Sequence, residues 1–145
     1  MTDIRELHRG ETELAAPAML ALRPRWETAG AIVDLIDSRL RPAGYRLAGL
    51  FDGEHESAVC VLGFREITTS GWGHVVYVDD LSTLPDARGH GHADRLLSWV
   101  EAEARRLGCE ALHLDSGVGP DRFAAHRLYM RHHLAIGAHH FHLDL

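Results

Sequence analysis

Residues 81–108, LSTLPDARGHGHADRLLSWVEAEARRLG, contain the glycine- and histidine-rich stretch Arg88-Gly-His-Gly-His-Ala93. The residues before this stretch are strand-like, and the residues after it repeat apolar side chains at helical spacing. The helical stripe consists of Ala93, Leu96, Leu97, Val100, Ala104 and Leu107. Gly108 supplies a helix stop. The sequence therefore predicts a tight turn between a strand and a long amphipathic helix.

A turn of this kind is a favourable place for an anion. The first backbone N–H groups of a helix have no partner within the helix, and the helix dipole adds partial positive charge there. Gly89 and Gly91 have no Cβ, so the backbone can approach a phosphate and adopt positive φ, while Arg88 can add a charged contact. The turn predicts a phosphate or pyrophosphate site. The alternative is a tight turn without a ligand.

Two common phosphate-binding loops do not fit this stretch. A Walker A loop ends in Gly-Lys-Ser/Thr, and the chain contains no lysine. A dinucleotide-binding loop has a third glycine, and Asp94 stands in its place here. Asp115 does stand at the end of the next predicted strand, where a dinucleotide-binding fold carries an acidic residue.

The remaining patterns complete the order of elements. Strands are predicted within residues 3–9, 45–52, 57–69, 74–83, 110–116 and 138–145, and helices within residues 12–24, 29–44, 93–108 and 121–133. The last strand alternates Phe141, Leu143 and Leu145 with polar residues. The order β-α-α-β-β-β-α-β-α-β predicts an α/β fold with a mixed β-sheet flanked by helices on both faces. Residues 1–145 are expected to form a single domain.

Composition narrows the classes of partner. Twenty-one Asp and Glu residues stand against fifteen basic ones, all arginine, so the formal net charge is −6. This balance argues against a nucleic-acid partner and favours a cationic or amine partner. No apolar run is long enough for a membrane span and no leader pattern begins the chain, so we expect a cytoplasmic protein with no membrane partner.

Cysteines and histidines do not predict a metal site. Cys60 and Cys109 have no CxxC partner and are expected to be buried free thiols. The chain has twelve histidines, clustered at 132–133 and 139–142. His140 and His142 share a face of the predicted last strand, but a third ligand would have to come from elsewhere. We interpret them as a polar face of an edge strand. His90 and His92 can make anion binding at the turn depend on pH.

Two motifs together resemble those of a known family. The stretch Arg88–Ala93 fits the Arg/Gln-x-x-Gly-x-Gly/Ala signature of the GNAT superfamily of acetyl-CoA-dependent N-acetyltransferases. Downstream, AAHRLYMRHHL resembles the second signature, Ala-x-x-Leu-Tyr, with Ala125, Leu128 and Tyr129 in register. The predicted order of elements also resembles that family over nearly the whole chain.

The resemblance implies a binding site for acetyl-CoA as the acetyl donor. Backbone N–H groups of Arg88, Gly89, His90, Gly91, His92 and Ala93 would bind the pyrophosphate of this cosubstrate. The main chain of Leu81, Ser82 and Thr83 would pair with the pantetheine arm like an additional strand. The site would open where strands 74–83 and 110–116 separate. A backbone N–H near Asp79 and Asp80 would polarise the thioester carbonyl.

The resemblance also implies catalytic roles. Tyr129 matches the general acid that protonates the departing CoA thiolate. The position where family members often carry a glutamate base is Val75 here, which cannot serve. Asp79, Asp80, His74 and Asp115 remain as candidates. Because side chains alternate along a strand, Asp79 and Asp80 are expected on opposite faces. Leu81 and Thr83 match the family's apolar inward positions, and Asp79 lies on the same face as they do. Asp80 is therefore favoured as the residue that meets the substrate.

Two departures from the family pattern affect the second signature. Arg122 replaces a frequent asparagine at its start, and His133-Leu134 replaces a frequent Gly-Phe after it. They put the turn after this helix in doubt and leave the cofactor assignment standing.

Two functions follow from the resemblance. The first is an N-acetyltransferase that moves an acetyl group to a primary amine of a small molecule, peptide or protein. The alternative is a non-catalytic acyl-CoA-binding sensor or partner module on the same fold. The sequence leaves the oligomeric state open, although the apolar face of the predicted C-terminal strand, residues 138–145, would allow a homodimer.

Overall fold

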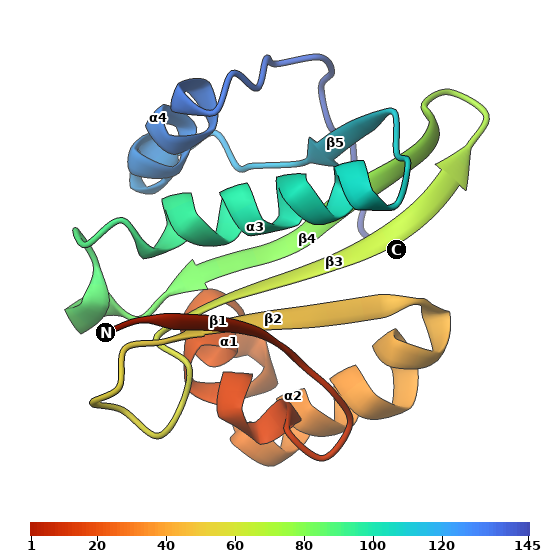
Figure 1. Ribbon diagram of the computed structural model, residues 1–145. Helices are drawn as coiled ribbons and strands as arrows, with labels where there is room; N and C mark the ends of the chain where they lie inside the picture. Colours follow the sequence, from red (N-terminus) through yellow and green to blue (C-terminus); the bar gives the residue numbers. More distant parts are fainter. The chain divides into compact units, whose positions relative to one another are not determined.

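Five strands form one sheet in the order β1-β2-β3-β4-β5 (Figure 1). They are β1 (Asp3–Leu7), β2 (Tyr45–Phe51), β3 (Cys60–Thr69), β4 (Gly73–Thr83) and β5 (Ala111–Leu114). The first four pair antiparallel in chain order. β5 returns beside β4 after helix α3 (His92–Arg106), and such a helical crossover joins parallel strands. The sheet is therefore mixed, as the sequence predicted.

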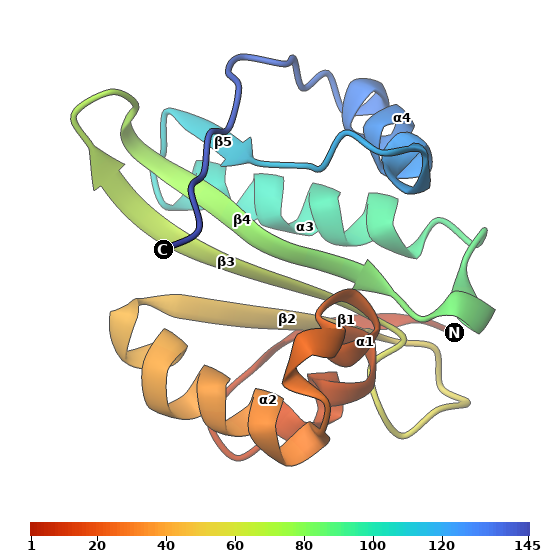
Figure 2. The ribbon, with the colours of Figure 1, turned by 180° about the vertical axis from the view of Figure 1, so that it is seen from behind.

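The computed structural model describes all 145 residues as two compact units, residues 1–113 and residues 114–145. In the first unit, α1 (Ala16–Leu22) and α2 (Ala29–Leu35) cover one face of the sheet and α3 covers the other (Figures 1 and 2). Because both faces are covered, neighbouring residues such as Leu47 and Ala48 are both fully buried. The predicted α/β class with helices on both faces is confirmed.

Local signals explain where these helices begin and end. The Thr28 side chain accepts a hydrogen bond from the N–H of Ala31 and caps α2. After α2 the chain continues through a π-helical turn and a 3₁₀ turn to Gly44, whose φ of 99° ends the helical segment. Along α3 the predicted stripe is buried against the sheet, at Leu96, Leu97, Val100 and Ala104.

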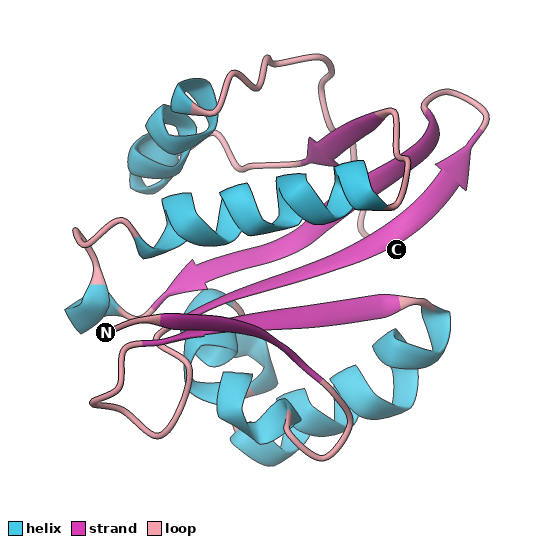
Figure 3. Ribbon diagram, viewed as in Figure 1, coloured by secondary structure: helices cyan, strands magenta, loops and turns pink.

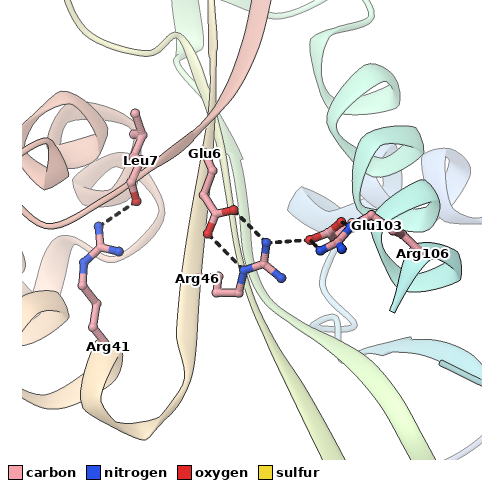
Figure 4. Close-up of polar contacts among 6 residues, drawn as sticks. All are labelled: Glu6, Leu7, Arg41, Arg46, Glu103 and Arg106. Carbon is pink, nitrogen blue, oxygen red and sulfur yellow. Dashed lines mark hydrogen bonds and ion pairs between the residues drawn. The ribbon is translucent and has the colours of Figure 1, made fainter. Parts of the chain in front are cut away.

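Arg46 of β2 forms ion pairs with residues of both the sheet and α3 (Figure 4). Its guanidinium donates to both carboxylate oxygens of Glu6 on β1, at 3.0 and 2.7 Å, and to Glu103 on α3 at 2.6 Å. Arg106 also donates to Glu103, at 2.5 and 2.9 Å. These contacts lower the pKa of Glu103 from its ordinary value of 4.5 to about 2. Two strands and one helix therefore share a single ionic network.

The second unit contains α4 (Phe123–Arg131), preceded by a 3₁₀ turn at Pro120–Arg122. The predicted strand at residues 138–145 is wrong: nothing after α4 is helix or strand (Figure 3). Alternation alone does not make a strand, because its N–H and C=O groups need a paired neighbour, and none of these residues takes part in a backbone ladder. Phe141 and Leu143 are exposed at 90% and 83%.

Helix length bears on the membrane question. The longest helix, α3, has 15 residues, and none in the structure combines the length and apolar character needed to cross a bilayer.

Candidate functional site

The turn between β4 and α3 has the backbone that the glycines predicted. Gly89 and Gly91 have φ angles of +81° and +76°, in the left-handed region that glycine tolerates best. A Cβ at either position would point into open space. No acceptor within the protein takes the N–H groups of residues 88–93, and the first helical hydrogen bond runs from Arg95 to Gly91 at 3.1 Å. The turn therefore presents an open row of donors at the N-terminus of a 15-residue helix.

Two imidazoles flank these donors. The rings of His90 and His92 are stacked, with centroids 5.7 Å apart. His90 Nδ1 lies 3.2 Å from the carbonyl oxygen of Ala87, while His92 Nδ1 is buried and has no hydrogen-bond partner. Burial, with a smaller contribution from His90, lowers the pKa of His92.

The end of β4 leaves one edge available. Leu81, Ser82 and Thr83 pair with β3 on one side. On the other side β5 starts beside His74, where the Glu110 N–H donates to the His74 carbonyl at 2.8 Å, and it has only four residues. It is too short to run alongside residues 81–83. Their outward N–H and C=O groups are therefore free to pair with an extended amide-containing chain.

A β-bulge lies where the acidic pair stands. Gly63 pairs with Asp80 and Phe64 pairs with Val78, so Asp79 is an extra residue in β4. The expectation that Asp79 and Asp80 face opposite sides is wrong. Asp80 contacts Tyr45 and Asp79 contacts Arg65. Tyr45 and Arg65 are directly paired across β2 and β3, and paired side chains share a face. The bulge thus cancels the alternation and turns both carboxylates toward the same face.

Asp80 is held on both of its oxygens. Oδ1 accepts from Arg23 Nε at 2.9 Å and Oδ2 accepts from the Tyr45 hydroxyl at 2.8 Å. Arg23, which follows α1, also donates to the carbonyl of Asp79 at 3.0 Å. Burial and the neighbouring Asp80 raise the pKa of Tyr45 well above its ordinary value. The Tyr45 hydroxyl occupies the space that a Cβ at Gly63 would need.

Asp79 has a different environment. Both of its oxygens accept from Arg65, at 2.9 Å each, and its side chain is 24% exposed. Burial raises the pKa of Asp79, although the Arg65 guanidinium opposes this. A raised pKa brings a carboxyl group closer to the range in which it can take a proton at neutral pH. The expected inward positions Leu81 and Thr83 are only half-buried, whereas Asp80 and Ser82 are buried.

The other predicted site residues lie elsewhere. Val75 is fully buried and cannot act as a base. His74 is at the opposite end of β4 from the turn, bonded to Glu66. Asp115 belongs to the second unit and pairs with His140 at 3.6 Å.

Tyr129 lies on α4, in the second unit, and is buried. Burial raises the pKa of its phenol, and Arg122 on the preceding turn opposes this. A phenol with a raised pKa stays protonated at neutral pH, which is what a proton donor requires. Arg122 occupies the start of the second signature, where the family often has asparagine.

Sequence reasoning missed the three partners of the acidic pair. Arg23 directly follows α1, Tyr45 and Arg65 belong to β2 and β3, and no short motif links them to Asp79 or Asp80. One signal was present. Two consecutive acidic residues inside an apolar strand indicate that the strand does not alternate normally at that point.

Together, the mixed sheet, the donor-lined turn before α3 and the free edge of β4 are suited to a phosphate-bearing cosubstrate with an extended arm. Comparisons with known proteins identify the class. Residues 2–134 match the family model described as "Acetyltransferase (GNAT) family". This chain therefore belongs to the GNAT acetyltransferase family, whose acetyl donor is acetyl-CoA.

One curated relative resembles this chain in sequence, and two solved structures share its fold. The aminoalkylphosphonate N-acetyltransferase of Salmonella typhimurium is 31% identical over 102 residues, which cover 70% of this chain and 61% of that protein. The match thus spans less than two thirds of the relative's length. A ribosomal-protein-alanine N-acetyltransferase structure from Brucella melitensis has a TM-score of 0.81 at 20% identity, over 100% of both chains. An aminoglycoside N-acetyltransferase in complex with CoA has a TM-score of 0.80 at 17% identity, covering 100% of this chain and 95% of that one.

Proposed function

We propose that this protein transfers an acetyl group from acetyl-CoA to a primary amine of a small molecule, peptide or protein. The observation that carries the proposal is the turn at residues 88–93, where unpaired N–H groups, two positive-φ glycines and a helix N-terminus coincide. The residues fit the cosubstrate, because the free edge of residues 81–83 continues from this turn toward the bulge at Asp79. Pyrophosphate, pantetheine arm and thioester would then follow β4 in that order.

The proposed chemistry divides between binding and proton transfer. The N–H groups of residues 88–93 hold the pyrophosphate, and residues 81–83 hold the arm. A bulge leaves an unpaired residue in the ladder, so the backbone at Asp79 is where an N–H group can face the thioester oxygen. The amine attacks the carbonyl carbon, the C–S bond breaks, and Tyr129 donates its phenolic proton to the departing thiolate.

The amine must lose a proton before it attacks. Asp79 and Asp80 both stay candidates for this step, and their contacts support different roles. Asp80 is fully engaged by Arg23 and Tyr45, so we assign it to positioning the bulge. Asp79 is more exposed and its pKa is raised, so we assign it to accepting the proton, directly or through water.

Relatives guide the choice of acceptor. The names of the matched proteins specify an aminoalkylphosphonate, an aminoglycoside and a protein alanine, and each of these acceptors carries an amine. We propose small primary amines first, with aminoalkylphosphonates at the head of the panel, because the aminoalkylphosphonate enzyme is 31% identical, against 20% and 17% for the other two. The negative charge of the chain and its paired aspartates support a cationic acceptor group.

The test is a release assay for free CoA thiol. Purified protein is incubated with acetyl-CoA and each amine, and the Tyr129→Phe variant is run beside it. The proposal expects turnover with at least one amine, and a fall of about 10²-fold or more in kcat for Tyr129→Phe with unchanged acetyl-CoA affinity by calorimetry. Acetyl-CoA binding without turnover on any amine class would instead support the acyl-CoA-binding module. Absence of binding by a folded protein would sink both.

Three broader predictions accompany this function. We expect residues 1–145 to act as a single catalytic domain, in the cytoplasm and without a nucleic-acid partner. Strand pairing through residues 138–145 no longer supports a homodimer, because these residues form no strand. Sedimentation analysis of the whole chain tests the oligomeric state directly.

A further inference from the structure

Three metal-ligating side chains meet at the end of β4 opposite the cosubstrate turn. They are Glu66 of β3, His74 of β4 and Cys109, which lies between α3 and β5. One donor atom from each lies within 4.8 Å of the others. His74 Nε2 is 2.6 Å from Glu66 Oε2 and 3.6 Å from Cys109 Sγ. Neither histidine cluster noted in the sequence is part of this group.

The backbone holds these three residues in place. His74 is paired with Thr68, two residues from Glu66, so Glu66 and His74 share one face of the sheet. The Cys109 N–H donates to the Ala104 carbonyl at 2.9 Å, just after Gly108 ends α3 with a φ of +75°. The next residue, Glu110, bonds the His74 backbone twice: its N–H donates to the His74 carbonyl at 2.8 Å and its carboxylate accepts from the His74 N–H at 3.0 Å.

The donor set and its spacing match zinc. We propose that Glu66, His74 and Cys109 bind Zn²⁺, with water in the fourth position. Tetrahedral zinc with Zn–S of about 2.3 Å and Zn–N of about 2.0–2.1 Å separates sulfur from nitrogen by roughly 3.6 Å. His74 Nε2 and Cys109 Sγ already have this separation. Thiolate and imidazole ligands select zinc over magnesium or calcium.

Only Glu66 has to move. A carboxylate oxygen and an imidazole nitrogen on one zinc ion are roughly 3.4 Å apart, so the 2.6 Å hydrogen bond between Glu66 and His74 must open by about 1 Å. The Glu66 side chain is 39% exposed, and rotation about its own bonds can supply this movement. The backbone of the other two ligands can stay where it is.

The position of the cluster indicates what the ion does. Residues 74 and 83 stand at opposite ends of β4, about 30 Å apart at roughly 3.3 Å per residue, and the cosubstrate turn follows the second of them. The thioester is proposed to lie near the bulge at Asp79, five residues along β4 from His74, or roughly 16 Å at about 3.3 Å per residue. The ion is therefore too far from the reacting group to take part in acetyl transfer. It would instead join β3, β4 and the segment between α3 and β5 at one point, and so stabilise the fold.

Cobalt reports this binding directly, because a thiolate ligand gives Co²⁺ a charge-transfer absorption that histidine and carboxylate do not. Reduced, chelator-treated protein is titrated with Co²⁺ and then with Zn²⁺, and its melting temperature is measured with and without Zn²⁺. We expect one ion per chain, a thiolate band that Zn²⁺ abolishes, and a melting temperature about 5 °C or more higher with excess Zn²⁺. Cys109→Ser should lose the band and at least tenfold in affinity.

A matched control variant removes three histidines that lie outside the proposed zinc site. A triple variant, His139→Gln, His140→Gln and His142→Gln, should keep the band, the affinity and the thermal shift. The proposal is overturned if the native protein gives no thiolate band, or if binding survives Cys109→Ser and disappears in the triple variant. Should Cys109→Ser fail to fold, Glu66→Gln at a partly exposed position is the second test: it should weaken Zn²⁺ binding while the thiolate band remains.

Discussion

The Tyr45 hydroxyl donates a 2.8 Å hydrogen bond to Asp80, and both residues are buried. This bond joins β2 to β4 two strands away and holds the residue that follows the bulge. Because burial and Asp80 raise the pKa of Tyr45, the folded protein binds the phenolic proton more tightly than the unfolded chain does.

Tyr45→Phe tests this relationship. The free energy of unfolding of this variant should be about 2 kcal/mol lower than that of the native chain at pH 8, the usual scale for a hydrogen bond to a charged group. A raised pKa stabilises the fold fully below the ordinary tyrosine value and loses this effect as pH rises above about 10. Urea unfolding curves measured at pH values from 8 to about 11.5 should therefore show that Tyr45→Phe loses less unfolding free energy with rising pH than the native chain does. Parallel losses would contradict the assignment.

Asp79→Asn and Asp80→Asn separate the two roles assigned to the acidic pair. Asp79→Asn should lower kcat/KM by about 10²-fold with little change in unfolding free energy, because its ion pair with Arg65 is partly exposed. Asp80→Asn should cost about 2 kcal/mol of stability, because an amide cannot accept from both Arg23 and Tyr45.

Arg65 supplies the check on the first of these roles. Arg65 lowers the pKa of Asp79, so Arg65→Gln should move the acid limb of the pH–rate profile to higher pH. An unchanged profile in Arg65→Gln, together with full activity in Asp79→Asn, would exclude Asp79 as the proton acceptor.

Gly91→Ala isolates the contribution of the turn to acetyl-CoA binding. Gly91 and Gly108 have φ angles of +76° and +75°, and a Cβ at either would meet nothing within 4 Å. Alanine at either position should therefore cost a similar 1–2 kcal/mol of stability, about the strain of a left-handed residue. Only Gly91→Ala places a methyl group among the donors of the turn. Calorimetry should show acetyl-CoA affinity reduced at least tenfold in Gly91→Ala and unchanged in Gly108→Ala; equal affinities would argue against the site.

Arg46→Met tests the ionic network between the sheet and α3. Arg46 is 26% exposed and bonds Glu6 and Glu103, so its loss should lower the unfolding free energy by about 2 kcal/mol at neutral pH. Arg105→Met is the matched control, since its pair with Glu101 is exposed at 78% and 45% and should contribute less than about 0.5 kcal/mol.

The same network predicts acid sensitivity. The pKa values of Glu6 and Glu103 are lowered in the fold, so their stabilising effect is complete above the ordinary value of 4.5 and is lost as pH falls toward about 2. In urea unfolding experiments, the Glu103→Gln variant should lose less unfolding free energy than the native chain as the pH falls from 4.5 toward about 2. Equal acid losses in both proteins would show that Glu103 does not contribute.

Local patterns predicted those parts of the fold that local forces decide. The apolar stripe of α3, its stop at Gly108 and the open turn at Gly89 and Gly91 all follow from spacing and backbone freedom within a few residues. Non-local features escaped this reasoning. Residues 138–145 alternate as a strand should, yet no neighbour pairs with them. The bulge at Asp79 depends on how β3 and β4 align, which no single strand encodes.

The candidate site divides in the same way. The motifs located the turn and Tyr129, because a short signature carries both. The partners Arg23, Tyr45 and Arg65 are 57, 35 and 14 residues from the carboxylates they contact. Their contacts exist only in the folded chain, so the roles of Asp79 and Asp80 required the structure.

Gly63 controls the acidic pair from the neighbouring strand, where it pairs with Asp80. It binds no substrate in the proposed site, yet the Tyr45 hydroxyl fills the space beside its Cα. Any larger side chain there must push the phenol aside and release Asp80 from its donor. A substitution in the middle of β3 would then change turnover without touching a reacting group. Substitutions at residue 63 should therefore reduce both activity and stability in mutational scans, because any side chain there displaces the Tyr45 hydroxyl.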